Sequence, residues 1–225
     1  MPVSNLKVVV VGMGVQGEKR SKIAKKDLVA TVDLDNNKAD YKYIEQLDDK
    51  SYEAVLLCTP DAVKYEFLKK LLYKKKHVLV EKPLYVSSIK EITELERISK
   101  KNNLVLYTAY NHRFEPHFIN MKKCLQRKEL GKVYRIRMSY GNGTSGLVKQ
   151  SKWRDKGSGV ISDIGSHLLD TLFFWFKNKK ISINETKSFC FENLSPDHAL
   201  LIGEINNIFF ELEVSLLNWR NDFVC

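Results

Sequence analysis

The sequence predicts an α/β protein with two domains. Residues 1–113 form a doubly wound parallel sheet, and residues 114–225 form an α+β domain with a largely antiparallel open sheet. Three observations predict this fold. Short apolar runs alternate with stretches of helical periodicity up to about residue 113, as parallel strands with helical crossovers require. A glycine-rich turn follows the first apolar run. After residue 113 the pattern changes to alternating residues and longer apolar segments.

The first apolar run, Leu6 to Val11, leads directly into the turn Gly12-Met13-Gly14-Val15-Gln16-Gly17. Gly12 allows a sharp turn off the strand, Gly14 lets backbone N–H groups approach a pyrophosphate, and Gly17 allows close packing of the helix on the sheet. The following helix start supplies unpaired donors and a partial positive charge. These residues predict a Rossmann dinucleotide site, although a glycine turn that serves packing alone remains the alternative.

Asp33 ends the next strand, Leu28 to Val32, about 20 residues after Gly12. Its carboxylate can accept hydrogen bonds from the hydroxyls of a ribose. Asp35 adds a second negative charge that would repel a 2'-phosphate, so NAD is favoured over NADP, although Lys38 lies nearby. Between Asp33 and Ala54 the chain is too short for two further crossovers and a strand, which predicts a trimmed sheet edge.

The rest of the first domain continues the alternation. Apolar runs predict strands over residues 54–59, 77–80 and 104–110, and helical spacing predicts a helix over residues 63–72. Ser88 and Glu91 have the spacing of a capping box, which predicts a helix that begins there.

Lys82 follows the strand over residues 77–80, within Val80-Glu81-Lys82-Pro83-Leu84. Ligands bind at the carboxyl ends of parallel strands, so a lysine there points towards the cofactor crevice. Its ammonium can stabilise the alkoxide form of a substrate hydroxyl as hydride leaves. Pro83 is stiff and can be cis, which would limit where Lys82 points. A strand-end lysine before proline is also a common turn sequence.

The second domain begins with a predicted helix over residues 116–126 and a strand over residues 133–140, in which Ile136 and Met138 alternate with Arg135 and Arg137. A flexible glycine-rich loop is expected at residues 141–146. The other expected elements are a helix and three apolar segments, at residues 164–176, 181–191, 199–205 and 208–217.

A second candidate cluster is Asp163-Ile164-Gly165-Ser166-His167, at the expected helix start. Asp163 and His167 are four residues apart, so the carboxylate can orient the imidazole, which suits a general base for an alcohol proton. The alternative is an Asp cap beside a buried, hydrogen-bonded histidine. His112 and His117 flank Pro116, which disrupts a regular ligand face, and we expect no metal site.

Composition excludes several classes. The net charge is +10, but the lysine pairs and triplets fall on predicted solvated faces without interleaved aromatic residues, so we expect no nucleic-acid partner; an anionic small substrate stays compatible. There is no membrane-spanning apolar run and no signal core, which favours a cytoplasmic protein. The four cysteines, Cys58, Cys124, Cys190 and Cys225, form no C-x-x-C pair, which argues against zinc and disulfides.

From Lys7 onward the sequence resembles the glucose-fructose oxidoreductase and inositol dehydrogenase family (Gfo/Idh/MocA). The resemblance rests on the glycine turn, the Asp163 cluster and the segments Thr59-Pro60, Glu81-Lys82-Pro83, Tyr110-Asn111-His112-Arg113-Phe114, Leu130-Gly131-Lys132-Val133 and Trp153-Arg154. It implies that Lys82 and His167 act at the reacting carbon with Asp163 in support. It also implies that Thr59, Pro60, Glu81 and Asn111 line the cofactor site, and that Arg113, Trp153 and Arg154 lie near the substrate.

The resemblance implies an NAD-dependent dehydrogenase for a secondary hydroxyl of a sugar, cyclitol or nucleotide-sugar, in a homo-oligomer formed through the open sheet. Family members generally exceed 300 residues, so we expect a C-terminally truncated second domain with an exposed sheet edge here; the alternative is a short variant that pairs this edge with another chain. A catalytically silent dinucleotide sensor is the alternative, although a sensor needs none of Lys82, Asp163 and His167. A reductase for an imine or enone is a third reading, and it needs no hydroxyl base.

Overall fold

The computed structural model describes residues 6–151, 154–177 and 180–225. The chain divides into two compact units, Met1–Ala109 and Tyr110–Cys225. Sequence patterns favour a boundary after residue 113, four residues later. The difference arises because Tyr110 is the N-cap residue of a 3-10 turn, η3 (Asn111–Phe114), that belongs to the second unit. Each unit has its own sheet and its own apolar core.

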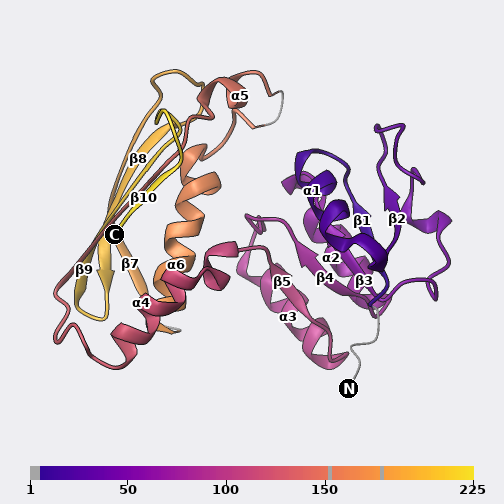
Figure 1. Ribbon diagram of the computed structural model, residues 1–225, viewed down its shortest axis with the longest axis horizontal. Helices are drawn as coiled ribbons and strands as arrows, with labels where there is room; N and C mark the ends of the chain where they lie inside the picture. The colour runs from indigo at the N-terminus through magenta and orange to yellow at the C-terminus, as the bar shows by residue number, and fades with distance from the viewer. Residues whose placement is uncertain (1–5, 152–153, 178–179) are drawn as a thin grey trace. The chain divides into compact units, whose positions relative to one another are not determined.

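The first unit contains a five-stranded parallel sheet, which confirms the predicted doubly wound fold (Figure 1). Its strands are β1 (Val8–Val11), β2 (Leu28–Val32), β3 (Ala54–Leu57), β4 (His77–Val80) and β5 (Leu106–Thr108). The order is β2-β1-β3-β4-β5, so the chain leaves β1 for one neighbour and later returns to its other side at β3. Val9 and Val55 are fully buried, as expected for strands that are covered on both faces.

Three helices connect the strands: α1 (Val15–Ala24), α2 (Asp61–Tyr73) and α3 (Ile89–Lys101). Short 3-10 turns, η1 (Lys25–Asp27) and η2 (Ile44–Gln46), complete the unit. The predicted start of α3 is right, but the predicted capping box is wrong. Ser88 makes no side-chain cap, and Glu91 instead accepts a hydrogen bond from the backbone N–H of Ser87 at 2.7 Å. Spacing alone could not decide which N–H the carboxylate reaches.

The sheet edge beside β2 is trimmed, as predicted. Among the described residues, no strand lies beyond β2 in the sheet order, and an isolated bridge joins Val32 to Tyr41 there. Asp40 tightens the returning chain, because its carboxylate accepts hydrogen bonds from the N–H and the hydroxyl of Thr31 at 2.8 and 2.7 Å. The short connection therefore folds back on β2 without forming a full crossover.

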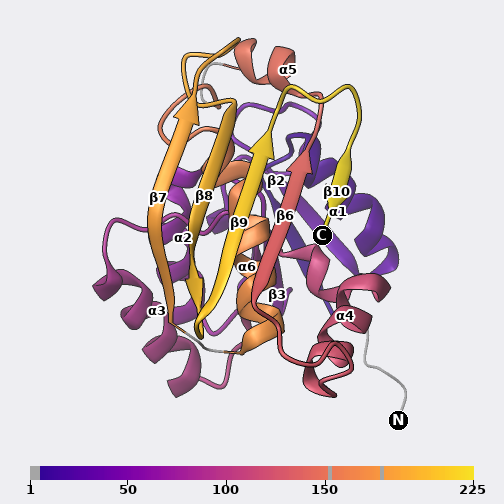
Figure 2. The same ribbon diagram turned by 90° about the vertical axis from the view of Figure 1, so that its left-hand side faces the viewer.

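The second unit packs helices on one face of a five-stranded sheet (Figure 2). Its helices are α4 (Pro116–Gln126), α5 (Ser145–Lys149) and α6 (Ser166–Phe176), and a π-helical turn, η4 (Ile161–Gly165), precedes α6. The strands are β6 (Arg135–Gly141), β7 (Ile181–Phe189), β8 (His198–Ile205), β9 (Ile208–Ser215) and β10 (Asp222–Val224). The predicted loop over residues 141–146 is only partly right, because Gly141 ends β6 and α5 begins at Ser145; the glycine content concealed the helix.

The second sheet has the order β10-β6-β9-β8-β7. Three of its four pairings are antiparallel, as predicted, but β6 pairs with β9 in parallel. Alternation in β6 correctly shows that Ile136 and Met138 are buried while Arg135 and Arg137 are exposed. Alternation reports which face is buried and carries no information about strand direction, so the sequence could not reveal the parallel pair.

Candidate active site

The predicted cofactor residues of the first unit follow directly after its parallel strands. Gly12 follows β1, Asp33 follows β2, Thr59 comes soon after β3, and Glu81 and Lys82 follow β4. Because these strands are parallel, all five residues belong to one edge of the sheet. Ligands of open parallel sheets bind outside this edge, at the point where the strand order reverses.

Two glycines of the first turn are required by close backbone contacts. Gly12 has a φ of +91°, and a Cβ there would lie 2.6 Å from the carbonyl oxygen of Cys58. A Cβ on Gly17 would lie 1.8 Å from the carbonyl oxygen of Gly12. Gly17 therefore allows the helix to close on the turn itself, whereas the sequence suggested a contact with the sheet. Any side chain at either position would displace the turn.

Gly14 differs, because a Cβ there would meet nothing within 4 Å. It is the N-cap residue of α1 and has no side-chain cap, and Gly14, Val15 and Gln16 are all exposed. The first backbone N–H groups of this ten-residue helix have no partner within the helix, and they belong to exposed residues. Such a helix start binds phosphate groups through its donors and its partial positive charge. The turn fits the pyrophosphate of a dinucleotide.

Asp33 is held by three backbone N–H groups. One carboxylate oxygen accepts from Met13 at 2.6 Å, and the other accepts from Asp35 at 2.9 Å and from Asn36 at 2.8 Å. Burial, the largest single influence, raises the pKa of Asp33, but the three hydrogen bonds together hold the pKa below its ordinary value of 3.8. Asn36 also donates to the carbonyl of Met13 at 2.9 Å. Asp33 therefore stays ionised, and it keeps one of roughly four acceptor positions for a ribose hydroxyl.

Thr59 and Pro60 lie between β3 and α2. The hydroxyl oxygen of Thr59 is buried and has no hydrogen-bond partner within the described part of the chain. A buried hydroxyl without a partner is costly, which indicates a polar group that completes it. Pro60 is exposed and is the N-cap residue of α2. The unsatisfied hydroxyl at this edge is a second feature that fits a bound cofactor.

Glu81 and Lys82 are anchored differently. The Glu81 carboxylate accepts a hydrogen bond from Nε of Arg20, on α1, at 2.7 Å, and it also lies 2.5 Å from Nη2 of the same side chain. Lys82 is half-buried, and the Lys82–Pro83 peptide bond is cis. Sequence analysis did not single out Arg20, because α1 is polar along most of its length and Arg20 has no distinguishing neighbour.

Sequence analysis also missed Lys64, on α2. Its ammonium donates to the carbonyl oxygens of Glu81 at 2.7 Å and Pro83 at 2.8 Å, the residues on either side of Lys82. It also pairs with Asp61 at 2.7 Å, and the Lys64 side chain is only 2% exposed. A buried lysine in a lysine-rich helix has no sequence signal. Lys64 fixes the backbone that carries Lys82.

In the second unit, Asp163 lies in the π-helical turn that precedes α6. Its carboxylate accepts a hydrogen bond from Arg154 at 3.0 Å, so two of the predicted site residues are paired. π-Helical turns are uncommon and frequently occur at functional sites. Trp153, the third residue predicted in this region, lies outside the described residues.

His167 is in the first turn of α6 and is 7% exposed. Aromatic rings surround it: the centroid of His112 lies 4.8 Å away, that of Tyr110 5.5 Å away in an edge-on arrangement, and that of Tyr140 6.1 Å away. His112 is itself stacked on Phe118 at 4.4 Å. These contacts pack the imidazole among aromatic rings. No spacing in the sequence connected these rings to His167.

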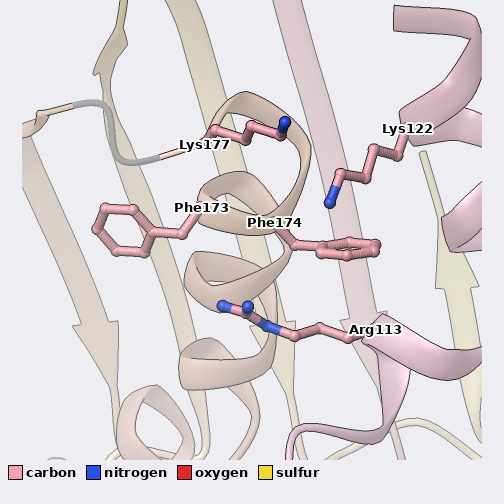
Figure 3. A pocket seen from close by; sticks show the side chains of 5 residues that line it. All are labelled: Arg113, Lys122, Phe173, Phe174 and Lys177. Atoms are coloured by element: carbon pink, nitrogen blue, oxygen red, sulfur yellow. The ribbon is translucent and has the colours of Figure 1, made fainter. Parts of the chain in front are cut away.

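Arg113 is held by Asp170, one turn after His167 on α6. The guanidinium donates two hydrogen bonds to the carboxylate, at 2.7 and 2.6 Å. Arg113 also lines a pocket with Lys122, Phe173, Phe174 and Lys177 (Figure 3). The sequence suggested a substrate contact for Arg113 and did not identify Asp170.

Asn111, predicted to line the cofactor site, belongs to the second unit. It is exposed and donates a hydrogen bond to Glu115 at 2.6 Å. Among the described residues, no group of three or more metal-ligating side chains comes together. None of the described helices is long and apolar enough to cross a membrane.

Two family models match the chain. Residues 6–110 match the oxidoreductase family with an NAD-binding Rossmann fold, and residues 118–219 match the GFO/IDH/MocA C-terminal domain. The first match agrees with the glycine turn and with Asp33, and it identifies the first unit as an NAD-binding domain. The second match covers most of the unit that contains Asp163 and His167.

Several known proteins are similar to this chain. An uncharacterized oxidoreductase of Schizosaccharomyces pombe is 35% identical over 144 residues, which is 61% of this chain and 38% of that protein. Glucose-6-phosphate 3-dehydrogenase of Bacillus subtilis is 24% identical over 84% of this chain and 60% of its own length. The scyllo-inositol 2-dehydrogenase (NADP(+)) of the same organism is 28% identical over 62% of this chain and 39% of its own length. The chain thus spans less than two thirds of these relatives.

Solved structures show the same fold. An inositol dehydrogenase homolog from Azotobacter vinelandii, in complex with NADH and myo-inositol, superposes with a TM-score of 0.81 at 21% identity over 95% of this chain and 64% of that one. GenD2 from gentamicin A biosynthesis, in complex with NAD, superposes with a TM-score of 0.83 at 21% identity over 97% of this chain and 68% of that one. With both family models matched along one chain, this protein belongs to the GFO/IDH/MocA family of oxidoreductases.

Proposed function

We propose that this protein is an NAD-dependent dehydrogenase that transfers hydride between the nicotinamide and a secondary hydroxyl or ketone of a sugar, cyclitol or nucleotide-sugar. The observation that carries the proposal is that both Lys82 and His167 are anchored in restricted surroundings. Lys64 fixes the backbone on either side of Lys82, and aromatic rings enclose His167. A protein that only bound a dinucleotide would need neither arrangement.

The first unit offers what a dinucleotide needs. The open start of α1 at Gly14 suits the pyrophosphate, Asp33 suits a ribose hydroxyl, and the unsatisfied Thr59 hydroxyl suits a further polar group of the cofactor. Bound NAD supplies the acceptor for hydride. One relative carries NADP(+) in its name, so relatives do not decide between the cofactors. The ionised Asp33 favours NAD, because its charge repels a 2'-phosphate.

The chain's own residues then act on the substrate. His167 takes the proton of the reacting hydroxyl, as a neutral imidazole can. The Lys82 ammonium donates a hydrogen bond to the same oxygen and stabilises the negative charge that develops on it as hydride leaves. Asp163, paired with Arg154, supports the turn that carries His167. The relatives named for sugar and inositol dehydrogenation support this substrate class.

NAD reduction, followed at 340 nm against a panel of sugars, sugar phosphates, inositols and nucleotide-sugars, tests the proposal. In the panel's best substrate, Lys82→Met and His167→Asn should each lower kcat at least ~100-fold, the usual contribution of a proton-transfer group, while NADH binding by fluorescence stays within a few fold. No turnover with any substrate, combined with tight NADH binding, contradicts the proposal and favours a catalytically silent dinucleotide sensor. Near-normal rates in both variants contradict the assigned roles.

A further inference from the structure

A pocket of about 360 Å³ lies between α4 and the end of α6 in the second unit (Figure 3). It is lined by Arg113, Lys122, Phe173, Phe174 and Lys177. Phe174 forms its centre. The Lys122 ammonium lies 3.7 Å from the centroid of this ring, and the Arg113 guanidinium lies 5.6 Å from it. Two cationic side chains therefore face the Phe174 ring, and a third, Lys177, lines the same pocket.

Among the residues that the structure describes, Arg113 is the one cation of the three that has a counter-charge. Asp170 binds the Arg113 guanidinium through two hydrogen bonds. Within the described ranges, no carboxylate pairs with Lys122 or Lys177, and neither ammonium donates a hydrogen bond to a protein group. Figure 3 shows both lysine side chains reaching towards the space above Phe174. The pocket thus carries two uncompensated positive charges.

The surroundings of Lys122 disfavour its charged form. Burial first, and then the positive charges of Lys177 and Arg113, lower the pKa of the Lys122 ammonium from its ordinary value of 10.5. A site that disfavours its own cations gains most from an anion, because the bound charge removes this repulsion.

The helix dipole of α6 can explain the position of Lys177 but not that of Lys122. Lys177 is at the C-terminal end of α6, where a positive charge stabilises the helix dipole. Lys122 comes from α4 and lies over a ring, and it donates no hydrogen bond to the carbonyl groups of α6 within the described residues. The helix dipole therefore does not account for the second lysine.

We propose that this pocket binds a phosphate group, with Lys122 and Lys177 as its donors and the exposed Phe173 ring as an apolar wall for the rest of the ligand. A phosphate monoester carries two negative charges and three terminal oxygens, which match two ammonium groups better than a singly charged carboxylate does. Arg113, which is bound to Asp170, adds positive charge on the other side of the Phe174 ring.

This pocket is separate from the position of His167. Seven residues of α6 separate His167 from Phe174, which at 1.5 Å per residue is about 10 Å along the helix. The proposed site is therefore a second site of the same unit, and it does not depend on the proposed dehydrogenase activity. Its test can succeed or fail whether or not a substrate is found.

Calorimetric titration of the whole chain tests the proposal, with inorganic phosphate and phenyl phosphate as probes. Saturating NADH is present throughout, so that the start of α1 cannot contribute a phosphate signal. We expect saturable one-to-one binding that Lys122→Met and Lys177→Met each weaken at least ~10-fold, because each removes a charge-assisted contact. Lys123→Met, which removes the exposed neighbouring lysine of α4, should leave the affinity unchanged.

The two probes show whether the pocket binds free phosphate or a phosphomonoester. Tighter binding of phenyl phosphate indicates a phosphomonoester whose body contacts Phe173, and equal binding indicates free phosphate. Circular dichroism checks that each variant is folded, and two independent lysine variants keep the test valid if one is not. The proposal is wrong if the wild type shows no saturable binding, or if Lys123→Met weakens binding as much as the two pocket variants do.

Discussion

The two units hold their candidate site residues in different ways. In the first unit most of the contacts that position these residues involve the backbone. Three N–H groups bind Asp33, and Lys64 binds two carbonyl groups beside Lys82. In the second unit the partners are side chains. Arg113 pairs with Asp170 and Arg154 with Asp163, and rings surround His167. Glu81, paired with Arg20, is the exception in the first unit.

This difference explains which parts of the site a sequence can reveal. Backbone-held residues depend on where strands end and where glycines occur, and both leave a pattern within a short stretch of chain. Side-chain pairs join positions far apart, such as Arg113 and Asp170, which are separated by 57 residues. Neither partner has a special neighbour in the sequence.

The largest effect is expected for Lys64→Met. The substitution removes a buried ammonium and leaves two carbonyl oxygens and the Asp61 carboxylate without their donor. We expect a loss of about 2 kcal/mol in the free energy of unfolding, since a hydrogen bond to a charged group contributes roughly 1.5–3 kcal/mol. Urea unfolding followed by circular dichroism measures it.

Lys69→Met is the matched control on the same helix. Lys69 pairs with Glu94 at the surface, where solvent screens the interaction, so its loss should matter much less. If the two variants unfold at the same urea concentration, the contacts of Lys64 with the backbone beside Lys82 contribute nothing, and backbone anchoring does not distinguish the first unit.

A smaller effect is expected on cofactor choice. The wild type should bind NAD more tightly than NADP, because the ionised Asp33 repels a 2'-phosphate and accepts a ribose hydroxyl. Asp33→Ser should weaken the binding of NAD on the order of 10-fold, as expected for one lost charge-assisted hydrogen bond. The difference in affinity between NAD and NADP should therefore become smaller. Calorimetric titration with both cofactors gives the ratio.

Asp35→Asn provides the control for charge alone. Asp35 contacts Asp33 only through its backbone N–H, which the substitution retains, so the cofactor ratio should change less than in Asp33→Ser. A wild type that binds NADP as tightly as NAD would refute the assignment of Asp33.

The smallest effect concerns acid stability. Asp197 is the counterpart of Asp33 in the second unit: it is fully buried and accepts hydrogen bonds from the backbone N–H groups of Phe191, Glu192 and Asn193. Burial, the largest single influence, raises the pKa of Asp197. The backbone hydrogen bonds together lower this pKa by more, so that it lies below its ordinary value of 3.8. The second unit therefore also contains a carboxylate that accepts three backbone hydrogen bonds, as Asp33 does in the first unit.

The sign of the pH effect follows from these lowered values. A carboxyl group whose pKa is lower in the folded state stabilises the protein above its unfolded pKa of about 3.9, and the stabilisation is lost as the pH falls through the folded value. We expect the melting temperature to fall below about pH 4. Asp197→Asn should lower it at pH 6 and flatten this dependence in melts between pH 3 and pH 6. An unchanged acid slope would show that other carboxylates control it.

Much of the fold could be predicted, because periodicity reports burial directly. Predicted and observed bounds agree for β2, β4 and α4. The parallel pairing of β6 with β9 could not be predicted, because the same alternation suits either direction. The capping box at Ser88 failed for a related reason: Glu91 had two nearby N–H groups, and only the geometry of the turn selected Ser87.

The cofactor edge of the first unit could be predicted from the sequence. A strand, three glycines and a strand-end aspartate lie within a short stretch of chain, so their spacing predicts a dinucleotide site. Only the tertiary structure decided what holds Lys82, Arg113 and His167, namely Lys64, Asp170 and a set of aromatic rings. The reason is physical: short-range patterns record the preferences of the backbone, whereas a buried ion pair or ring contact exists only when distant segments pack together.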